Sequence, residues 1–398
     1  MKKNLLLLAG TSLVCLVLLE VVLRFASPPI VTGVGTTRAP KAKLYGWAEL
    51  PSTRGHFIHP DTGKVVYFPI NSQGWKDVEH AFEKPSGTIR ILFLGDSGTF
   101  GVVSLEDLYT RQVERLLKDG GHNVEVISIG IGGWGTDQEL EALEREGVKY
   151  QPDLVVYQFT NNDLYDNINP KEGLPPSDIF WEKPFKYELA DGKLTRVLLE
   201  PRPERSGFRV WVRKLVYQSA LLYNLNRIRH RRKDLAGLKD AQNKIAPDDV
   251  YAAGEQNAEC QRAWKLTEAL IVRMKEVAEQ HGARFLAFAA EGEPGHRHWL
   301  LRWNRIHTDG KSDWVIWQGK QYPIDWQRSL KDLGKVCGRL GVPVIAPKRE
   351  IERYEHDPHP NAAGNLAMAQ DIVDFLKEWP PFVQMVGTNA PRNSARAE

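Results

Sequence analysis

A serine, a histidine and a carboxylate in this chain have the chemistry needed to attack an ester. Ser97 stands in the stretch Gly-Asp-Ser-Gly at 95–98, and His359 follows Asp357 by two positions near the other end of the chain. A serine hydroxyl attacks an acyl carbon when a histidine takes its proton and a carboxylate holds that histidine in the right tautomer. These residue types predict acyl transfer, with Ser97 as nucleophile, His359 as base and Asp357 as the group that orients the base.

Two further positions offer the hydrogen-bond donors that acyl transfer requires. The tetrahedral intermediate carries a negative oxygen, which backbone or amide N–H groups must stabilise. Gly133, in a glycine-rich turn at 130–135, offers an N–H that no side chain obstructs, and Asn162 offers an amide without adding charge. With the N–H of Ser97 itself, these groups predict an oxyanion hole of Ser97, Gly133 and Asn162.

The candidate residues follow short apolar runs of the kind buried on both faces of a parallel sheet. The predicted strands cover 91–94, 124–129, 152–159, 284–289 and 342–346, and the predicted helices cover 104–120, 136–148, 257–281, 326–340 and 361–379. We expect Thr136 and Glu139 to open the second helix with a capping box. Alternating strands and helices predict right-handed crossovers with helices on both faces. The predicted fold class is α/β, a flavodoxin-like three-layer αβα arrangement around a five-stranded parallel sheet.

The predicted topology places the candidate residues at one rim of the sheet. Ser97, Gly133 and Asn162 each follow a predicted strand, and Asp357 and His359 lie between the fifth strand and the last helix. In open parallel sheets, reactive groups gather in the crevice beyond the carboxyl ends of the strands. We therefore expect all five residues to face one crevice.

The same residues carry a resemblance to a known family. Four segments resemble the four sequence blocks of the SGNH (GDSL) hydrolases: Gly95-Asp96-Ser97, Gly133, Asn162-Asp163 and the Asp357/His359 pair. The resemblance covers roughly residues 90–376, with a large insertion at about 164–253, and Asn71-Ser72-Gln73-Gly74 resembles a stretch in membrane-anchored bacterial members. It implies a Ser97–His359–Asp357 triad, an oxyanion hole of Ser97, Gly133 and Asn162, no metal or cofactor, and esterase, lipase or carbohydrate O-acyl chemistry.

Two positions depart from the family pattern. The acidic residue usually stands three positions before the histidine, where this chain has His356, so Asp357 takes its place and Glu355 is the alternative. Some members of the family, including polysaccharide O-acetyltransferases, use this shorter spacing. Thr160 stands where a glycine usually precedes the asparagine of the third block. Asp96 and Asp163 are expected to brace their turns rather than to take part in the chemistry.

The N-terminus predicts a membrane anchor. Lys2 and Lys3 precede an apolar run over residues 5–23, which spans roughly 28 Å as a helix, about the thickness of a bilayer core. Glu20 and Arg24, one turn apart, are expected to pair. With the lysines inside, the rest of the chain would lie in the periplasm or otherwise outside the cytoplasm. A cleaved signal peptide is the alternative.

This organisation gives four segments. They are an anchor at 1–25, a linker and lead-in at 26–89, a hydrolase-like domain at 90–380 and a tail at 381–398. The net charge of +3 on 398 residues is too small to favour nucleic acid as a partner, and the three cysteines lack the spacing of a zinc site. The expected partners are an acylated carbohydrate or lipid and, through residues 5–23, a membrane.

Several features leave alternatives open. The basic stretch at 227–233 suits either anionic partners or a solvated helix face. Trp299, Trp303, Trp314, Trp317 and Trp326 suit either a sugar-stacking platform or ordinary packing. For the reaction, the first hypothesis is an esterase that removes an acyl group such as acetyl. The second is a polysaccharide O-acetyltransferase, and the third is a non-catalytic scaffold with the same fold.

Overall fold

The computed structural model describes residues 2–26, 39–168, 183–199, 219–222, 224–225, 258–289, 297, 301, 306–317 and 320–389. The chain divides into two compact units, Met1–Thr32 with Pro201–Lys244 and Gly33–Glu200 with Ile245–Glu398. In the first unit, helix α1 (Lys2–Ala26) contains the expected Glu20–Arg24 ion pair, at 2.9 Å. Among the described residues, no helix combines the length and apolar character that crossing a membrane requires.

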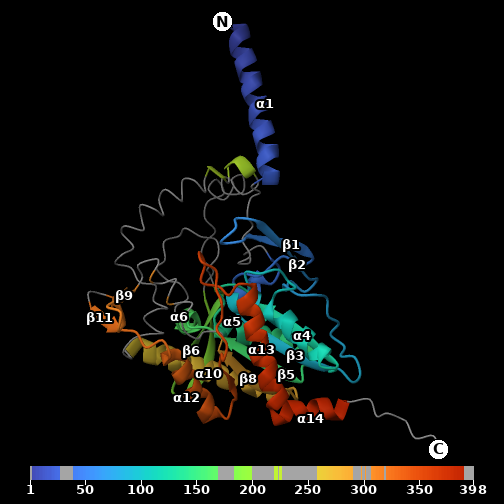
Figure 1. The fold of residues 1–398 in the computed structure, drawn as a ribbon, viewed down its shortest axis with the longest axis vertical. Coiled ribbons are helices and arrows are strands. Elements are labelled where there is room, and N and C mark those ends of the chain that lie inside the picture. The colour runs from blue at the N-terminus through green and yellow to red at the C-terminus, as the bar shows by residue number, and fades with distance from the viewer. Residues whose placement is uncertain are drawn as a thin grey trace, which may run out of the picture. The chain divides into compact units, whose positions relative to one another are not determined.

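The second unit is built on the predicted five-stranded parallel sheet (Figure 1). Its strands are β3 (Ile89–Gly95), β4 (Val124–Gly130), β5 (Leu154–Phe159), β8 (Arg284–Ala289) and β12 (Val344–Ile345). Their order across the sheet is β12-β8-β5-β3-β4, which is the flavodoxin-like order 2-1-3-4-5 read from the other edge. All seven residues of β3 are buried, as an apolar run at the centre of such a sheet requires.

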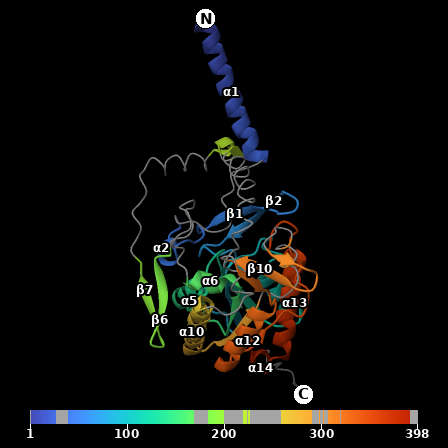
Figure 2. The same ribbon diagram turned by 90° about the vertical axis from the view of Figure 1, so that its left-hand side faces the viewer.

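Helices cover both faces of the sheet, which gives the predicted three layers. Alternate residues of β3 point to opposite faces, so Leu92 and Leu94 join one apolar core while Ile91 and Phe93 join the other. The first core includes residues of α5 (Thr136–Arg145), α10 (Ala258–Gln280) and α12 (Arg328–Leu340), and the second includes residues of α4 (Tyr109–Asp119) and α13 (Ala362–Glu378). Figure 2 shows α5 and α10 apart from α13, on the other side of this unit.

Several predicted boundaries differ from the structure, two of them in ways that change the element. The first helix of the domain begins at Tyr109 rather than at Ser104, because Ser104 and Asp107 bond one another in a turn. The segment expected as a tail from 381 begins instead with α14 (Pro380–Asn389), whose Phe382 is buried against the second core. Residues 390–398 lie outside the described part.

The lead-in segment is folded over its described part, 39–89. It forms α2 (Ala42–Tyr45) and an antiparallel hairpin of β1 (Thr53–Ile58) and β2 (Val65–Ile70). Tyr45, Trp47 and Trp75 are buried in the first core, so this segment is part of the domain rather than a spacer.

The remaining described elements lie outside the five-stranded sheet. They are α3 (Ser97–Phe100), the 3-10 helix η1 (Gly147–Tyr150), α6 (Asn162–Ile168), the hairpin β6 (Phe185–Ala190) with β7 (Lys193–Leu198), and the small sheet of β9 (His307–Thr308), β10 (Asp313–Trp317) and β11 (Lys320–Pro323). The predicted insertion at 164–253 thus contains the part of α6 from Leu164 onward and the β6–β7 hairpin. Its basic stretch at 227–233 lies outside the described residues.

Candidate active site

The nucleophile turn joins β3 to α3 at the carboxyl end of the central strand. Asp96 caps α3, since its Oδ1 accepts the Gly98 N–H at 2.8 Å, and its side chain is fully buried. A Cβ added at Gly95 would lie 2.2 Å from the Thr99 Oγ1 atom and 2.4 Å from the Gln158 Oε1 atom, so only glycine fits. Asp96 therefore braces the turn, as expected, and Ser97 is left half-buried at the rim.

Asn162 lies beside this turn, at the start of α6. Its Nδ2 atom donates to Asp96 Oδ2 at 3.0 Å and to Asp166 Oδ2 at 3.1 Å. The Ser97 hydroxyl donates to the same Asp96 Oδ2 atom, at 3.4 Å. One carboxylate oxygen thus connects the predicted nucleophile with the predicted amide donor, so the structure brings Ser97 and Asn162 together.

Gly133 occupies the turn after β4, and the ladder places that turn at the same rim. Gly95 pairs with Gly130 at the ends of β3 and β4, so both strands stop in register. Gly133 has φ +75, a left-handed conformation that favours glycine. The indole N–H of Trp47 donates to the Gly132 carbonyl at 3.0 Å and fixes the turn. Within the described residues the Gly133 N–H makes no hydrogen bond, which leaves it open for a ligand.

The predicted histidine and its carboxylate meet in the loop between β12 and α13. The His359 Nδ1 atom lies 2.5 Å from Asp357 Oδ1, which also accepts the His359 backbone N–H at 2.9 Å. Burial raises the pKa of Asp357, but the hydrogen bond and the charge of His359 outweigh it and leave that pKa below its usual value. Glu355, the alternative carboxylate, is exposed, and its backbone N–H donates to Asp61. The geometry favours Asp357 over Glu355 as the partner of His359.

The histidine loop is tied to the segment that follows Ser97. The Tyr354 hydroxyl donates to the Val102 carbonyl at 2.6 Å, and Asn365 Oδ1 accepts the Tyr109 N–H at 3.1 Å. In the described part of the chain no hydrogen bond joins Ser97 and His359, because the Ser97 hydroxyl points to Asp96. Catalytic hydrogen bonds are often loose in free enzymes and tighten only with substrate bound.

Buried acids lie behind Asn162. Asp163 is fully buried, and its Oδ2 atom accepts the Tyr157 hydroxyl at 3.0 Å and the Thr160 N–H at 3.1 Å, so it braces its loop as expected. Glu139 is also fully buried, and in the described region neither carboxyl oxygen has a hydrogen-bond partner. Burial raises the pKa of both carboxyls well above the usual value, and the charge of Asp163 adds to the effect on Glu139.

The prediction of a Thr136–Glu139 capping box was wrong. Gly135 is the N-cap of α5, and Gln138 Oε1 accepts the Gly135 N–H at 3.2 Å. Sequence reasoning also missed Asp166, although its position four residues after Asn162 places both on one face of α6. Among the described residues, no group of three or more histidine, cysteine, aspartate or glutamate side chains is arranged to hold a metal ion.

Two of the tryptophans for which a sugar platform and ordinary packing were both open make local contacts within the protein. The Trp326 indole N–H donates to Asp313 at 2.9 Å, and Trp314 stacks on His307 with ring centroids 6.0 Å apart. Trp299, Trp303 and the side chain of Trp317 lie outside the described part.

Comparison with known proteins places this arrangement in a family. Residues 93–311, more than half of the chain, match the GDSL-like Lipase/Acylhydrolase family. The chain belongs to this family. It is an ester hydrolase of the SGNH type, as the sequence blocks predicted. The comparison with curated proteins gave no significant match.

Solved structures of low identity are also similar over most of the chain. A Clostridium thermocellum family 3 carbohydrate esterase is 11% identical, with a TM-score of 0.38, over 75% of this chain and 100% of the other. A lipase/acylhydrolase from Enterococcus faecalis is 14% identical, with a TM-score of 0.35, over 73% and 96%. A carbohydrate acetylesterase family member from Sinorhizobium meliloti is 12% identical, with a TM-score of 0.35, over 75% and 99%.

Proposed function

We propose that this family member is a serine esterase that removes an acyl group, such as acetyl, from an acylated glycan or lipid outside the cytoplasm. The observation that carries the proposal is the shared Asp96 Oδ2 atom, which holds the Ser97 hydroxyl and the Asn162 amide side by side at the strand ends. The Asp357–His359 pair on a neighbouring loop supplies the base. A nucleophile, an oriented base and a nearby donor are the parts that acyl transfer needs.

The proposed reaction begins when the Ser97 hydroxyl turns from Asp96 to the Nε2 atom of His359. Its oxygen forms a bond to the acyl carbon, and its proton passes to His359, whose Nδ1–H remains bonded to Asp357. The N–H groups of Ser97, Gly133 and Asn162 stabilise the negative carbonyl oxygen. Cleavage of the C–O bond releases the alcohol, which takes the proton from His359. Water then attacks the acyl-enzyme by the same route and frees Ser97.

An O-acetyltransferase is the second candidate, and the spacing of Asp357 and His359 is compatible with it. Their 2.5 Å contact supports the carboxylate two positions before the histidine, a spacing that some family members use, polysaccharide O-acetyltransferases among them. Both candidates form the same acyl-enzyme and differ only in whether water or a sugar hydroxyl accepts the acyl group.

The decisive experiment follows an aryl acetate with and without glycan acceptors. We expect acetate release that Ser97→Ala abolishes, together with labelling of Ser97 by a fluorophosphonate. If acetylated glycan forms at the expense of free acetate, the protein is an O-acetyltransferase rather than an esterase. Labelling that persists in Ser97→Ala would refute both, because the nucleophile would then lie elsewhere.

The extracytoplasmic location is proposed from the sequence alone. Lys2 and Lys3 before the apolar run at 5–23 favour a retained cytoplasmic N-terminus with the rest of the chain outside. A β-lactamase fused after residue 389 should protect intact bacteria from a β-lactam. Failure to protect, with the fusion stably produced, would place the enzyme in the cytoplasm.

A further inference from the structure

The turn of the β1–β2 hairpin reaches across to the loop that carries His359. Asp61, in that turn, accepts three hydrogen bonds from two consecutive residues of the loop. The Glu355 N–H donates to Oδ2 at 3.1 Å, the His356 N–H donates to Oδ1 at 3.0 Å, and the His356 Nδ1 atom lies 3.1 Å from the same oxygen. Asp61 thus binds the two residues that immediately precede Asp357, almost 300 positions further along the chain.

The turn is built to present this carboxylate. His59 Nδ1 accepts the backbone N–H groups of Asp61 at 3.3 Å and Thr62 at 3.2 Å, and Gly63 closes the turn with φ +69. The His59 ring also packs edge-on against Tyr354, with centroids 4.9 Å apart. Burial raises the pKa of Asp61, but the hydrogen bonds from Glu355 and His356 outweigh it, so the carboxylate stays charged.

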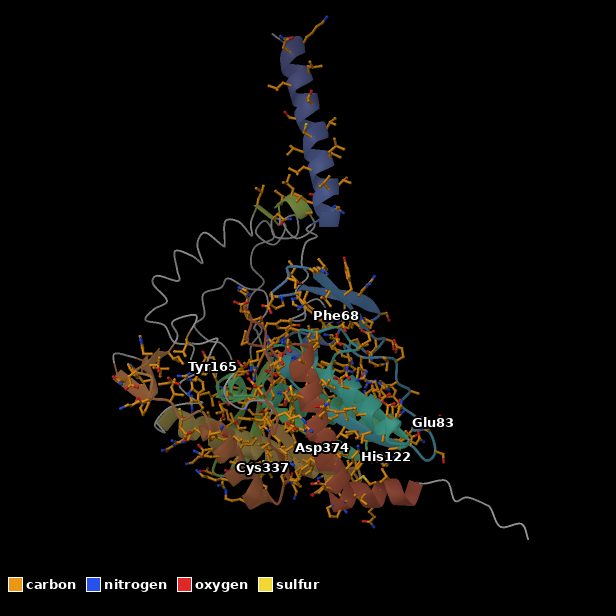
Figure 3. The ribbon with its side chains drawn as sticks, in the orientation of Figure 1. Phe68, Glu83, His122, Tyr165, Cys337 and Asp374 are labelled. Atoms are coloured by element: carbon orange, nitrogen blue, oxygen red, sulfur yellow. The ribbon has the colours of Figure 1, made fainter. Side chains whose placement is uncertain are left out.

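The other end of the hairpin rests on the nucleophile helix. Phe68 of β2, labelled in Figure 3, packs edge-on against Phe100 of α3 with centroids 5.4 Å apart. Lys76, just after the hairpin, is fully buried and donates to the carbonyls of Gly101 at 2.9 Å and Val103 at 2.6 Å. One hairpin therefore contacts both the helix that begins with Ser97 and the loop that holds His359.

The two ends of the histidine loop are held together, whereas its middle depends on the contact with Asp61. A β-bridge between Arg353 and Pro360 joins the ends. Near the apex, Asp61 holds the two residues that precede Asp357, while Asp357 in turn holds His359. A shift of Glu355 and His356 would move the Asp357 carboxylate directly.

We propose that Asp61 is a positioning residue that clasps the histidine loop and holds Asp357 and His359 in register with Ser97. The inference rests on the proposed serine mechanism and adds the hairpin to it. Asp61 acts through Asp357 and does not touch the substrate. Misplacing reacting groups by about 1 Å lowers the rate on the order of 100-fold. A small shift of the histidine loop after loss of Asp61 should therefore be measurable in kcat.

The test compares four variants of the full chain in detergent, with aryl acetate as the substrate. Asp61→Ala should lower kcat by about tenfold or more and leave KM within about twofold, because catalytic geometry is lost and substrate binding is not. Asp61→Asn should be intermediate, since its single carbonyl oxygen replaces only one of the two acceptors. His356→Ala keeps both backbone bonds and should stay near wild type.

Asp309→Ala is the matched control. Asp309 is also an exposed turn aspartate, and its Oδ1 atom accepts the N–H groups of Lys311 at 2.8 Å and Ser312 at 2.7 Å. Its loss should leave kcat unchanged. Thermal unfolding of every variant separates a local effect from general destabilisation, and Asp61→Asn decides the question if Asp61→Ala fails to fold.

A readout independent of turnover separates this inference from the proposed function. In histidine-labelled protein, the proton between His359 Nδ1 and Asp357 should be visible by NMR and protected from exchange with water. Asp61→Ala should accelerate its exchange, whereas Asp309→Ala should not. The positioning role of Asp61 would be refuted if the proton exchanged as slowly in Asp61→Ala as in the wild type and kcat equalled that of Asp309→Ala. If the wild type shows no Ser97-dependent activity, the proposed function is refuted instead. The exchange rate of the His359 Nδ1 proton then remains as the test of whether Asp61 positions the histidine loop.

Discussion

Replacing Asp357 by asparagine tests the chemistry of the site at its shortest contact. The Asp357 Oδ1 atom receives both the Nδ1 and the backbone N–H of His359, at 2.5 and 2.9 Å. Asparagine has nearly the same shape, but only one of its two amide groups can take the position of Oδ1. A carbonyl oxygen there would keep both bonds but would lack the negative charge that stabilises protonated His359. An NH₂ group there would donate to Nδ1 and favour the tautomer with the proton on Nε2. That tautomer cannot accept the proton of Ser97.

The expected loss follows from this change of tautomer. In serine enzymes, an aspartate-to-asparagine change of this kind lowers kcat by about 10⁴-fold, which corresponds to about 5 kcal/mol of barrier at 1.36 kcal/mol per tenfold. The Asp357 side chain is about a third exposed, so in the variant a water molecule can take over part of its hydrogen bonding to His359. We therefore expect a fall in kcat of about 10³-fold or more for Asp357→Asn.

The assay measures kcat and KM for aryl acetate hydrolysis, with Glu355→Gln as the matched control. Glu355 is the neighbouring carboxylate two positions earlier, and it is exposed. Its replacement should leave kcat near the wild-type value. If Asp357→Asn retains kcat within about tenfold while Glu355→Gln loses it, the assignment of Asp357 as the orienting carboxylate is refuted.

Three further changes probe the donor, the buried acids and the loop. Asn162→Ala should lower kcat by about 10²–10³-fold, the loss typical of one oxyanion donor, with little change in KM in the aryl acetate assay. Because burial raises the pKa of Glu139, the contribution of this residue to folded-state stability is greatest at acidic pH and is lost as the pH rises through that raised pKa. Thermal unfolding followed against pH should therefore show a smaller loss of stability with rising pH in Glu139→Gln than in the wild type. A Cβ at Gly364 would lie 2.1 Å from the Glu352 carbonyl oxygen, whereas one at Gly334 meets nothing within 4 Å. Gly364→Ala should therefore destabilise by about 1–3 kcal/mol in urea unfolding and impair the histidine loop, while Gly334→Ala should not; equal stabilities would contradict the packing.

The sheet could be predicted because buried strands leave a local signal. The apolar runs at 91–94 and 152–159 correspond to β3 and β5, which are buried along their whole length. The residues after these strands then meet because parallel strands end at one rim. Only two residues of the fifth predicted strand, Val344 and Ile345, pair with the neighbouring strand β8.

The contacts that tune the site had no such signal. Glu139 stands three positions after Thr136, which suggested a capping box, yet its carboxyl is fully buried and feels the charge of Asp163. Asp61 lies in an exposed turn of a segment that read as a linker and lead-in, and its partners are almost 300 residues away. Periodicity and strand-end rules describe neighbours along one element. They carry no information on which exposed loop docks on another.

The position of Asn162 between two carboxylates bears on how the oxyanion hole discriminates between substrate and transition state. The Asn162 Nδ2 atom already has an acceptor for each of its two N–H groups, in Asp96 and Asp166, so a neutral ester carbonyl gains little by replacing either. The developing oxyanion carries a negative charge and is therefore a stronger acceptor than the neutral carbonyl. The Asn162 interaction then strengthens as the negative charge forms, and an interaction stronger in the transition state than in the ground state raises kcat rather than tightening substrate binding.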